Sequence, residues 1–121
     1  LEGVGIGYTV SQVRAQLGTP KVDESTETEK LFLFQSEGGF NIRATFRNDK
    51  LILLTGQHLK IGEKSYAPGT SVEDFKKLLG DYDQRKVRWA GWEQLTWNRK
   101  KTAIKVVFRK DVMASAELEQ L

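Results

Sequence analysis

The stretch GYTVSQVRAQLG at residues 7–18 returns in outline as GTSVEDFKKLLG at residues 69–80. In the first stretch Thr9 can cap a helix, Gln12 stands at the capping-box position, and Gly18 can end the helix in a left-handed conformation. The second stretch has the corresponding residues Ser71, Asp74 and Gly80. The two stretches therefore predict two short helices with the same caps.

The offset of 62 residues between these stretches recurs far from the helices. Residues 46–49, with the sequence FRND, align with residues 108–111, which read FRKD. An offset that is preserved at both ends of a unit predicts a tandem duplication.

Between these anchors the hydrophobic period changes from helical to two. The apolar residues that alternate with polar ones are Phe40, Ile42, Ala44 and Phe46 in the first copy and Ile104, Val106 and Phe108 in the second. This alternation is typical of half-buried antiparallel strands, and residues 36–39 and 48–49 have the composition of turns. The predicted strands are residues 31–35, 40–47 and 51–55 in the first copy, and 92–97, 102–109 and a short one from 112, before a Glu-rich tail, in the second.

A lone helix on three strands has too small a core, but two such units can join their sheets and pack both helices on one face. The sequence thus predicts an α+β fold with two tandem α-β-β-β repeats, at about residues 7–57 and 69–115. The linker 58–68 has turn signals at Gly62 and at Pro68-Gly69 and is short. We therefore expect residues 1–121 to form a single compact domain with one open sheet face.

Composition narrows the class of protein. The chain has 121 residues and no cysteine, so disulfides and thiolate metal sites are excluded. Its longest apolar runs, such as residues 51–54, are far shorter than the roughly 20 residues of a membrane-spanning helix, which predicts no transmembrane segment. Because the chain begins at Leu1, we expect a mature or excised domain.

The net charge of +3 is unevenly distributed. Residues 85–110 are rich in lysine and arginine and contain Glu93 as their one acidic residue, whereas an acidic stretch opens at Asp23. The predicted basic patch comprises Arg85, Lys86, Arg88, Arg99, Lys100 and Lys101. One interpretation of this separation of charge is weak head-to-tail self-association, with the basic end of one copy against the acidic end of another. The other interpretation is that the charges on solvated loops diverged without a functional role.

The pattern Thr9-Val10-x-x-Val13-x-x-x-Leu17-Gly18-x-Pro20, followed by a meander of strands, resembles the opening helix of a known group. These are the SmpA/OmlA (BamE) outer-membrane lipoproteins and the β-lactamase-inhibitor proteins. The resemblance implies an extracytoplasmic protein, whether periplasmic, envelope-anchored or secreted. It also implies binding to other proteins through the open sheet face, and no catalysis.

The chain departs from this group in two respects. Residues 21–30 are polar and acidic where the group usually has a second short helix, and the inhibitor proteins have disulfides that this chain cannot form.

Two sets of residues are candidates for contact with a partner. Alternation places the first set, Arg43, Arg47, Lys105 and Arg109, on the open face as a basic row, or simply as a solvated surface. The second set comprises the aromatic residues Tyr82, Trp89, Trp92 and Trp97 of the second copy. We expect Trp97 to fill the core, and Trp89 and Trp92 to lie in a loop around Ala90-Gly91 as contact residues, because tryptophan and arginine are enriched at binding hot spots.

Catalytic and metal-binding signals are weak. His58 is the sole histidine and has no cysteine to act with, while Asp81 and Asp83 provide too few oxygens for a calcium loop. The glycines of residues 3–7 lack the lysine and hydroxyl residue of a phosphate-binding loop. We therefore predict no enzyme, cofactor or metal.

The leading prediction is a non-enzymatic protein-binding module that uses the open face and the tryptophans. The alternative is binding of a polyanion, such as nucleic acid, anionic lipid or an acidic polymer, through the basic second copy. A small enzyme with a pocket on the sheet face is a third hypothesis.

Overall fold

A computed structural model describes residues 3–35, 41–61 and 64–121 of the chain. The predicted turn at residues 36–39, Phe40 and Gly62 lie outside these residues. The elements are α1 (Val10–Leu17), β1 (Val22–Asp23), β2 (Glu29–Gln35), β3 (Asn41–Arg47), β4 (Lys50–Gly56), β5 (Leu59–Ile61), β6 (Lys64–Tyr66), α2 (Val72–Leu79), β7 (Gln84–Trp89), β8 (Trp92–Arg99), β9 (Thr102–Arg109) and β10 (Val112–Gln120).

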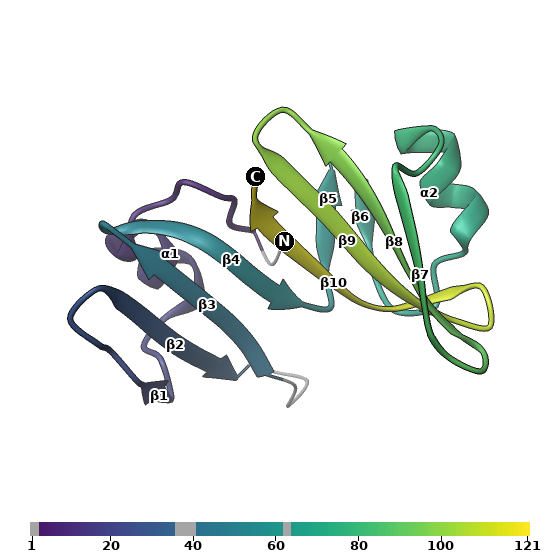
Figure 1. Cartoon of the computed structure of the whole chain (residues 1–121). Helices are drawn as coiled ribbons and strands as arrows, with labels where there is room; N and C mark the ends of the chain where they lie inside the picture. The colour runs from purple at the N-terminus through teal and green to yellow at the C-terminus, as the bar shows by residue number, and fades with distance from the viewer. Residues whose placement is uncertain (1–2, 36–40, 62–63) are drawn as a thin grey trace.

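Eight strands form one antiparallel sheet in the order β1-β2-β3-β4-β10-β9-β8-β7, and β5 and β6 form a separate hairpin (Figure 1). The two halves of the chain meet where β4 pairs with β10, with Leu54 opposite Leu118. The prediction of an α+β fold with side-by-side antiparallel strands is confirmed.

Both helices begin and end as their sequences predict. Thr9 accepts a hydrogen bond from the Gln12 backbone N–H and completes a capping box, while the hydroxyl of Ser71 caps α2. Gly18 and Gly80 end the helices at φ angles of 88° and 78°, a region that favours glycine.

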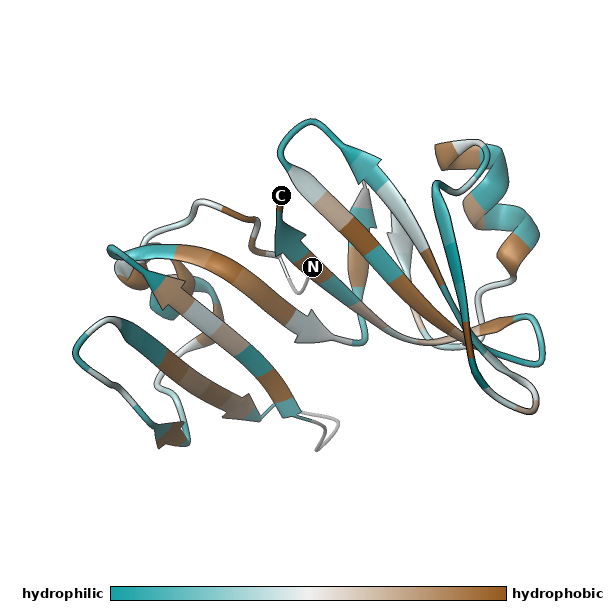
Figure 2. Ribbon diagram, viewed as in Figure 1, coloured by the Kyte–Doolittle hydropathy of each residue, from teal (hydrophilic) through white to brown (hydrophobic). Residues whose placement is uncertain are grey.

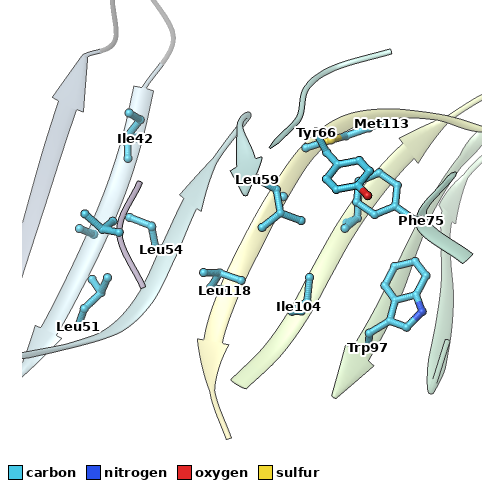
Figure 3. Packing of buried hydrophobic residues seen from close by; sticks show 14 of the residues in the cluster. Ile42, Leu51, Leu54, Leu59, Tyr66, Phe75, Trp97, Ile104, Met113 and Leu118 are labelled. Atoms are coloured by element: carbon cyan, nitrogen blue, oxygen red, sulfur yellow. The ribbon is translucent and has the colours of Figure 1, made fainter. Parts of the chain in front are cut away.

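The core lies on the face of the sheet that the two helices cover. One row of it crosses the sheet through paired residues, namely Phe32, Ala44, Leu54, Leu118, Ile104 and Trp97. Phe75 of α2 packs on Trp97 with ring centroids 6.1 Å apart, and Tyr66 of β6 packs on Phe75 at 4.8 Å (Figure 3). In Figure 1, α1 and the β5–β6 hairpin lie behind the sheet, and α2 lies beside β7 and β8. Phe75 of α2 packs against the buried Trp97 and Phe108, so α2 is on the core side and the opposite face is open.

Two predictions about the strands are wrong, and the linker contains a hairpin that was not predicted. Residues 22–23 form β1 and residues 84–89 form β7, so each half has four strands and not three. The Glu-rich tail belongs to β10, because Ala116 and Leu118 are buried while Glu117 and Glu119 alternate with them toward the open face. The linker 58–68 contains the β5–β6 hairpin, whose Leu59 and Tyr66 are core residues.

The two halves share details at the offset of 62 residues. Asn48-Asp49 and Lys110-Asp111 both turn with two positive φ angles, the geometry of a tight two-residue hairpin. Isolated bridges join Thr9 to Lys50 and Ser71 to Val112. These correspondences describe similar halves, and a duplication as their origin stays a prediction.

Candidate functional site

A row of side chains crosses the end of the sheet formed by the second half of the chain. In register, Trp89 of β7 lies opposite Trp92 of β8, which lies opposite Arg109 of β9, which lies opposite Val112 of β10. We call these four residues the aromatic row. Residues that are directly opposite in neighbouring strands point to the same face, so the row lies on the open face.

The aromatic row is exposed and internally packed. Trp89 is 59% exposed and Val112 is 40% exposed, while Trp92 is half-buried. The indole rings of Trp89 and Trp92 are 5.7 Å apart, and the Arg109 guanidinium lies 5.5 Å from the centre of the Trp92 ring. This cation–π contact and the tryptophan pair hold one another in place, so the row is organised before any partner binds.

The structure changes the expected setting of these tryptophans. Trp89 and Trp92 belong to strands and flank a tight turn at Ala90-Gly91, where Gly91 has a φ of 79°. The predicted aromatic group is not one cluster. Trp97 is fully buried, as expected, and its Nε1 donates a hydrogen bond of 3.0 Å to the Gly80 carbonyl.

Tyr82 lies beyond the far end of β7 from Trp89, which is a separation of about 20 Å along the strand. Its ring is 36% exposed and has the Lys76 ammonium 5.7 Å from its centre. Tyr82 is therefore separate from the aromatic row.

Acidic side chains offset part of the charge of the predicted basic row on the open face. All four of its members lie on that face, but Arg47 forms an ion pair of 2.6 Å with Glu29, and Lys105 pairs with Glu119 and lies 3.9 Å from Glu117. Arg43 forms no ion pair among the described residues. The glutamates of β2 and β10 convert the expected basic row into a face of mixed charge.

A groove of about 400 Å³ lies on the open face beside the aromatic row. Its polar lining includes Asn41, Thr55, Arg88, Gln94, Lys105 and Glu117. Burial raises the pKa of Glu117, and the nearby Lys105 opposes this increase. The groove therefore offers hydrogen-bonding groups and both signs of charge.

The predicted basic patch is divided between two places. Arg85 pairs with Glu93 at 2.7 Å and Arg88 donates to Gln94 at 2.6 Å, both beside the β7–β8 turn, whereas Arg99 lies 3.7 Å from Asp83 at the other end of β8. The three lysines of the patch, Lys86, Lys100 and Lys101, form no ion pair with other described residues.

Three further features bear on function. No group of histidine, aspartate or glutamate in the described ranges could hold a metal ion. His58, the sole histidine of the chain, lies between β4 and β5. None of the helices in the described ranges is long and apolar enough to cross a membrane.

Sequence reasoning missed Val112, Glu117 and Glu119 as members of the open face. The alternation of buried Met113, Ala116 and Leu118 with exposed residues is the signal, but it is interrupted by a bulge between Met113 and Ser115. A bulge moves the period by one residue, so the tail does not look like a strand in the sequence.

No family model matches the chain, and no curated protein matches its sequence. Two solved structures share its fold. An extracellular protein containing an SCP domain, from Bacillus anthracis, is 12% identical with a TM-score of 0.69 over 95% of this chain. The DUF4309 family protein YjgB from Bacillus subtilis is 13% identical with a TM-score of 0.59 over 93% of this chain and 78% of its own length.

The chain spans 44% of the length of the Bacillus anthracis protein. A candidate β-lactamase inhibitor protein from Streptococcus mutans is 16% identical over 93% of this chain and 83% of its own length, with a TM-score of 0.40 that is too low to argue from. The similarities to the two Bacillus proteins support the fold. The resemblance of the first helix to the SmpA/OmlA lipoproteins stays a prediction.

Proposed function

We propose that this chain is a non-enzymatic protein-binding module that holds its partner with the aromatic row and the adjoining open face. The observation that carries the proposal is the exposure of Trp89, at 59%, in a row ordered by Trp92 and Arg109. A folded domain gains stability by burying such a ring, and tryptophan with arginine is the pairing most enriched at interface hot spots.

The rest of the open face fits this role. The paired charges of Arg47 with Glu29 and of Lys105 with Glu117 and Glu119 give a polar surface without a strong field of one sign. A polar rim around an aromatic anchor is the usual anatomy of a protein interface. Binding through such a face should weaken only moderately with salt.

We further propose an extracytoplasmic location. The Bacillus anthracis protein that shares the fold is described as extracellular. The absence of cysteine from this chain is compatible with both a reducing and an oxidising compartment.

The test is affinity capture from bacterial envelope extracts with three forms of the chain. We expect the wild-type chain and the charge-reversed Arg99→Glu/Lys100→Glu/Lys101→Glu variant to retain one defined protein, and Trp89→Ala to lose it. Retention of that protein by Trp89→Ala would contradict the proposed role of the aromatic row. Thermal unfolding of each variant checks that the fold is intact.

Polyanion binding is the second candidate, because the unpaired ammonium groups of Lys86, Lys100 and Lys101 are exposed. It predicts a steep loss of heparin affinity with rising salt and a collapse of binding in the same charge-reversed variant. Tryptophan fluorescence during heparin titrations of the wild-type chain and this variant, at several salt concentrations, measures both quantities.

A further inference from the structure

β7 forms one of the two edges of the eight-stranded sheet, and its six residues are all exposed. Its inner side pairs with β8, and no strand of the described chain pairs with its outer side. An edge strand of this length presents a row of unpaired backbone N–H and C=O groups, which can pair with another extended chain.

The opposite edge of the sheet is constructed differently. β1 is only two residues long, and these residues are at the positions equivalent to the start of β7. The chain around it stays close to β2, with backbone hydrogen bonds from Lys21 to Leu33, from Glu24 to Leu31 and from Thr26 to Glu29. These bonds cover the edge of β2, and the regular edge strand there is two residues long, against six residues in β7.

The charges of the two edges are opposite in sign. β7 carries Arg85, Lys86 and Arg88, while the segment that covers β2 carries acidic residues from Asp23 onward. Two copies of β7 side by side would bring like charges together, which disfavours self-pairing of this edge. The same cations attract an extended segment that is acidic.

We propose that the outer edge of β7 binds an extended acidic segment of a partner protein by strand addition. The backbone of the segment pairs with the free edge, and its carboxylates lie beside Lys86 and Arg88. This inference adds a contact surface, the sheet edge, to the open-face contact proposed above and does not depend on it.

The side chains of β7 define the pattern of the segment. Lys86 lies opposite Gln94 on the open face, and Val87 lies opposite Glu93 on the helix-covered face, where its side chain is 59% exposed. Arg85 is already paired with Glu93 on that face. A segment that alternates acidic and apolar residues therefore fits, with carboxylates on the open face and apolar side chains beside Val87.

The test is the affinity of the full chain for a fluorescein-labelled peptide of about eight residues that alternates glutamate and valine, long enough to span β7. The control peptide has the same sequence with N-methyl groups on alternate residues, which removes the backbone donors on one edge and preserves the charge. Fluorescence anisotropy at about 50 mM salt gives both affinities while the electrostatic attraction is weakly screened.

We expect N-methylation to weaken binding about tenfold, since two or more hydrogen bonds are lost. We expect Lys86→Glu to weaken binding of the unmodified peptide about fivefold, because an attraction becomes a repulsion. The matched control is Lys101→Glu, an exposed cation at the other end of β8, for which a change below twofold is expected. Amide hydrogen exchange at residues 84–89 should slow when the peptide binds.

Several outcomes would overturn the inference. One is equal affinity for the methylated peptide, which would indicate charge attraction alone, and another is equal loss in Lys86→Glu and Lys101→Glu. Absence of peptide binding, or a dimer of the chain that forms through β7, would also overturn it. None of these results affects the capture experiment with Trp89→Ala. A negative result for strand addition at β7 can therefore be distinguished from a negative result for binding through the aromatic row.

Discussion

The two halves of this chain share their framework and differ in their outermost strands. Both have a capped helix that ends in glycine, a hairpin turn with two positive φ angles and a bridge from the helix cap to the sheet. In the first half the outermost strand has two residues, whereas in the second half it has six and ends in an exposed tryptophan. The residues that the two halves share therefore specify the fold, whereas the differences between the halves are concentrated at one end of the sheet.

The largest expected effect concerns Trp97, the largest fully buried side chain of the core. Trp97→Ala should lower the free energy of unfolding by about 3–5 kcal/mol, because the indole is fully buried against Phe75. The counterpart of Trp97 in the first half is the buried Phe34, which pairs with Ile42 as Trp97 pairs with Ile104. The neighbouring Gln35 is exposed and serves as the surface control, so Gln35→Ala should cost less than about 1 kcal/mol. Urea unfolding measures both. Equal costs would show that the buried indole of Trp97 does not stabilise the core.

The milder variant Trp97→Phe keeps this test usable if Trp97→Ala fails to fold. It removes part of the ring and the hydrogen bond to Gly80, and should still destabilise more than Gln35→Ala.

The helix ends test what the halves share. Gly18→Ala and Gly80→Ala should each cost roughly 1–3 kcal/mol, because both glycines have positive φ and extended ψ. A Cβ at either position meets no atom within 4 Å, so the cost comes from the backbone alone and should be similar in the two variants. A large difference between the losses of unfolding free energy in the two variants would show that the two helix ends are not equivalent.

Substitutions in the two hairpin turns should change the unfolding free energy by a smaller amount, and the change should have opposite signs in the two halves. Asn48 and Lys110 hold the same place with φ angles of 53° and 50°, and asparagine tolerates this region better than lysine. Lys110→Asn should raise the unfolding free energy by about 0.5–1 kcal/mol, and Asn48→Lys should lower it by a similar amount. Thermal unfolding of both variants is the measurement. Stability shifts of the same sign in Lys110→Asn and Asn48→Lys would contradict this prediction.

The smallest effect depends on pH. Burial raises the pKa of Glu117 above 4.5 in the folded chain, so the unfolded chain loses this proton first as the pH rises. Ionisation of Glu117 therefore lowers stability above that pKa, and the loss is reversed as the pH falls through this range. Glu117→Gln should be slightly more stable than wild type at pH 7, with the difference disappearing toward pH 4.

Thr55, directly opposite Glu117, holds the equivalent place in the first half and does not titrate. Thr55→Ser is therefore the matched control, and its stability should follow the wild-type pH curve. A Glu117→Gln curve parallel to wild type from pH 4 to 7 would contradict the assigned cause of the shift.

The sequence predicted much of this fold because its signals are local. Thr9, Ser71, Gly18 and Gly80 mark helix ends through their own backbone and side-chain chemistry. The joining of the sheets followed from the need of each small unit for a larger core. β7 could not be predicted in the same way, because an exposed edge strand buries no residue and so lacks apolar alternation.

The candidate site was predictable in its residues and not in its arrangement. Trp89 and Trp92 were singled out by composition, but their registration with Arg109 and Val112 depends on pairing across four strands. The charge of the open face depends on which glutamates lie beside Lys105, and Glu119 is 14 residues away in the chain. Figure 2 shows the resulting contrast between the hydrophilic β7 and the hydrophobic bands of β4 and β9.

The most direct test of the account is amide hydrogen exchange of the full chain with and without the protein captured from envelope extracts. We predict slower exchange in the second half, at residues 84–95 and 107–113, and unchanged exchange at the equivalent residues 22–33 of the first half. Protection of the first half without the second would contradict the central claim that the surface unique to the second half binds the partner.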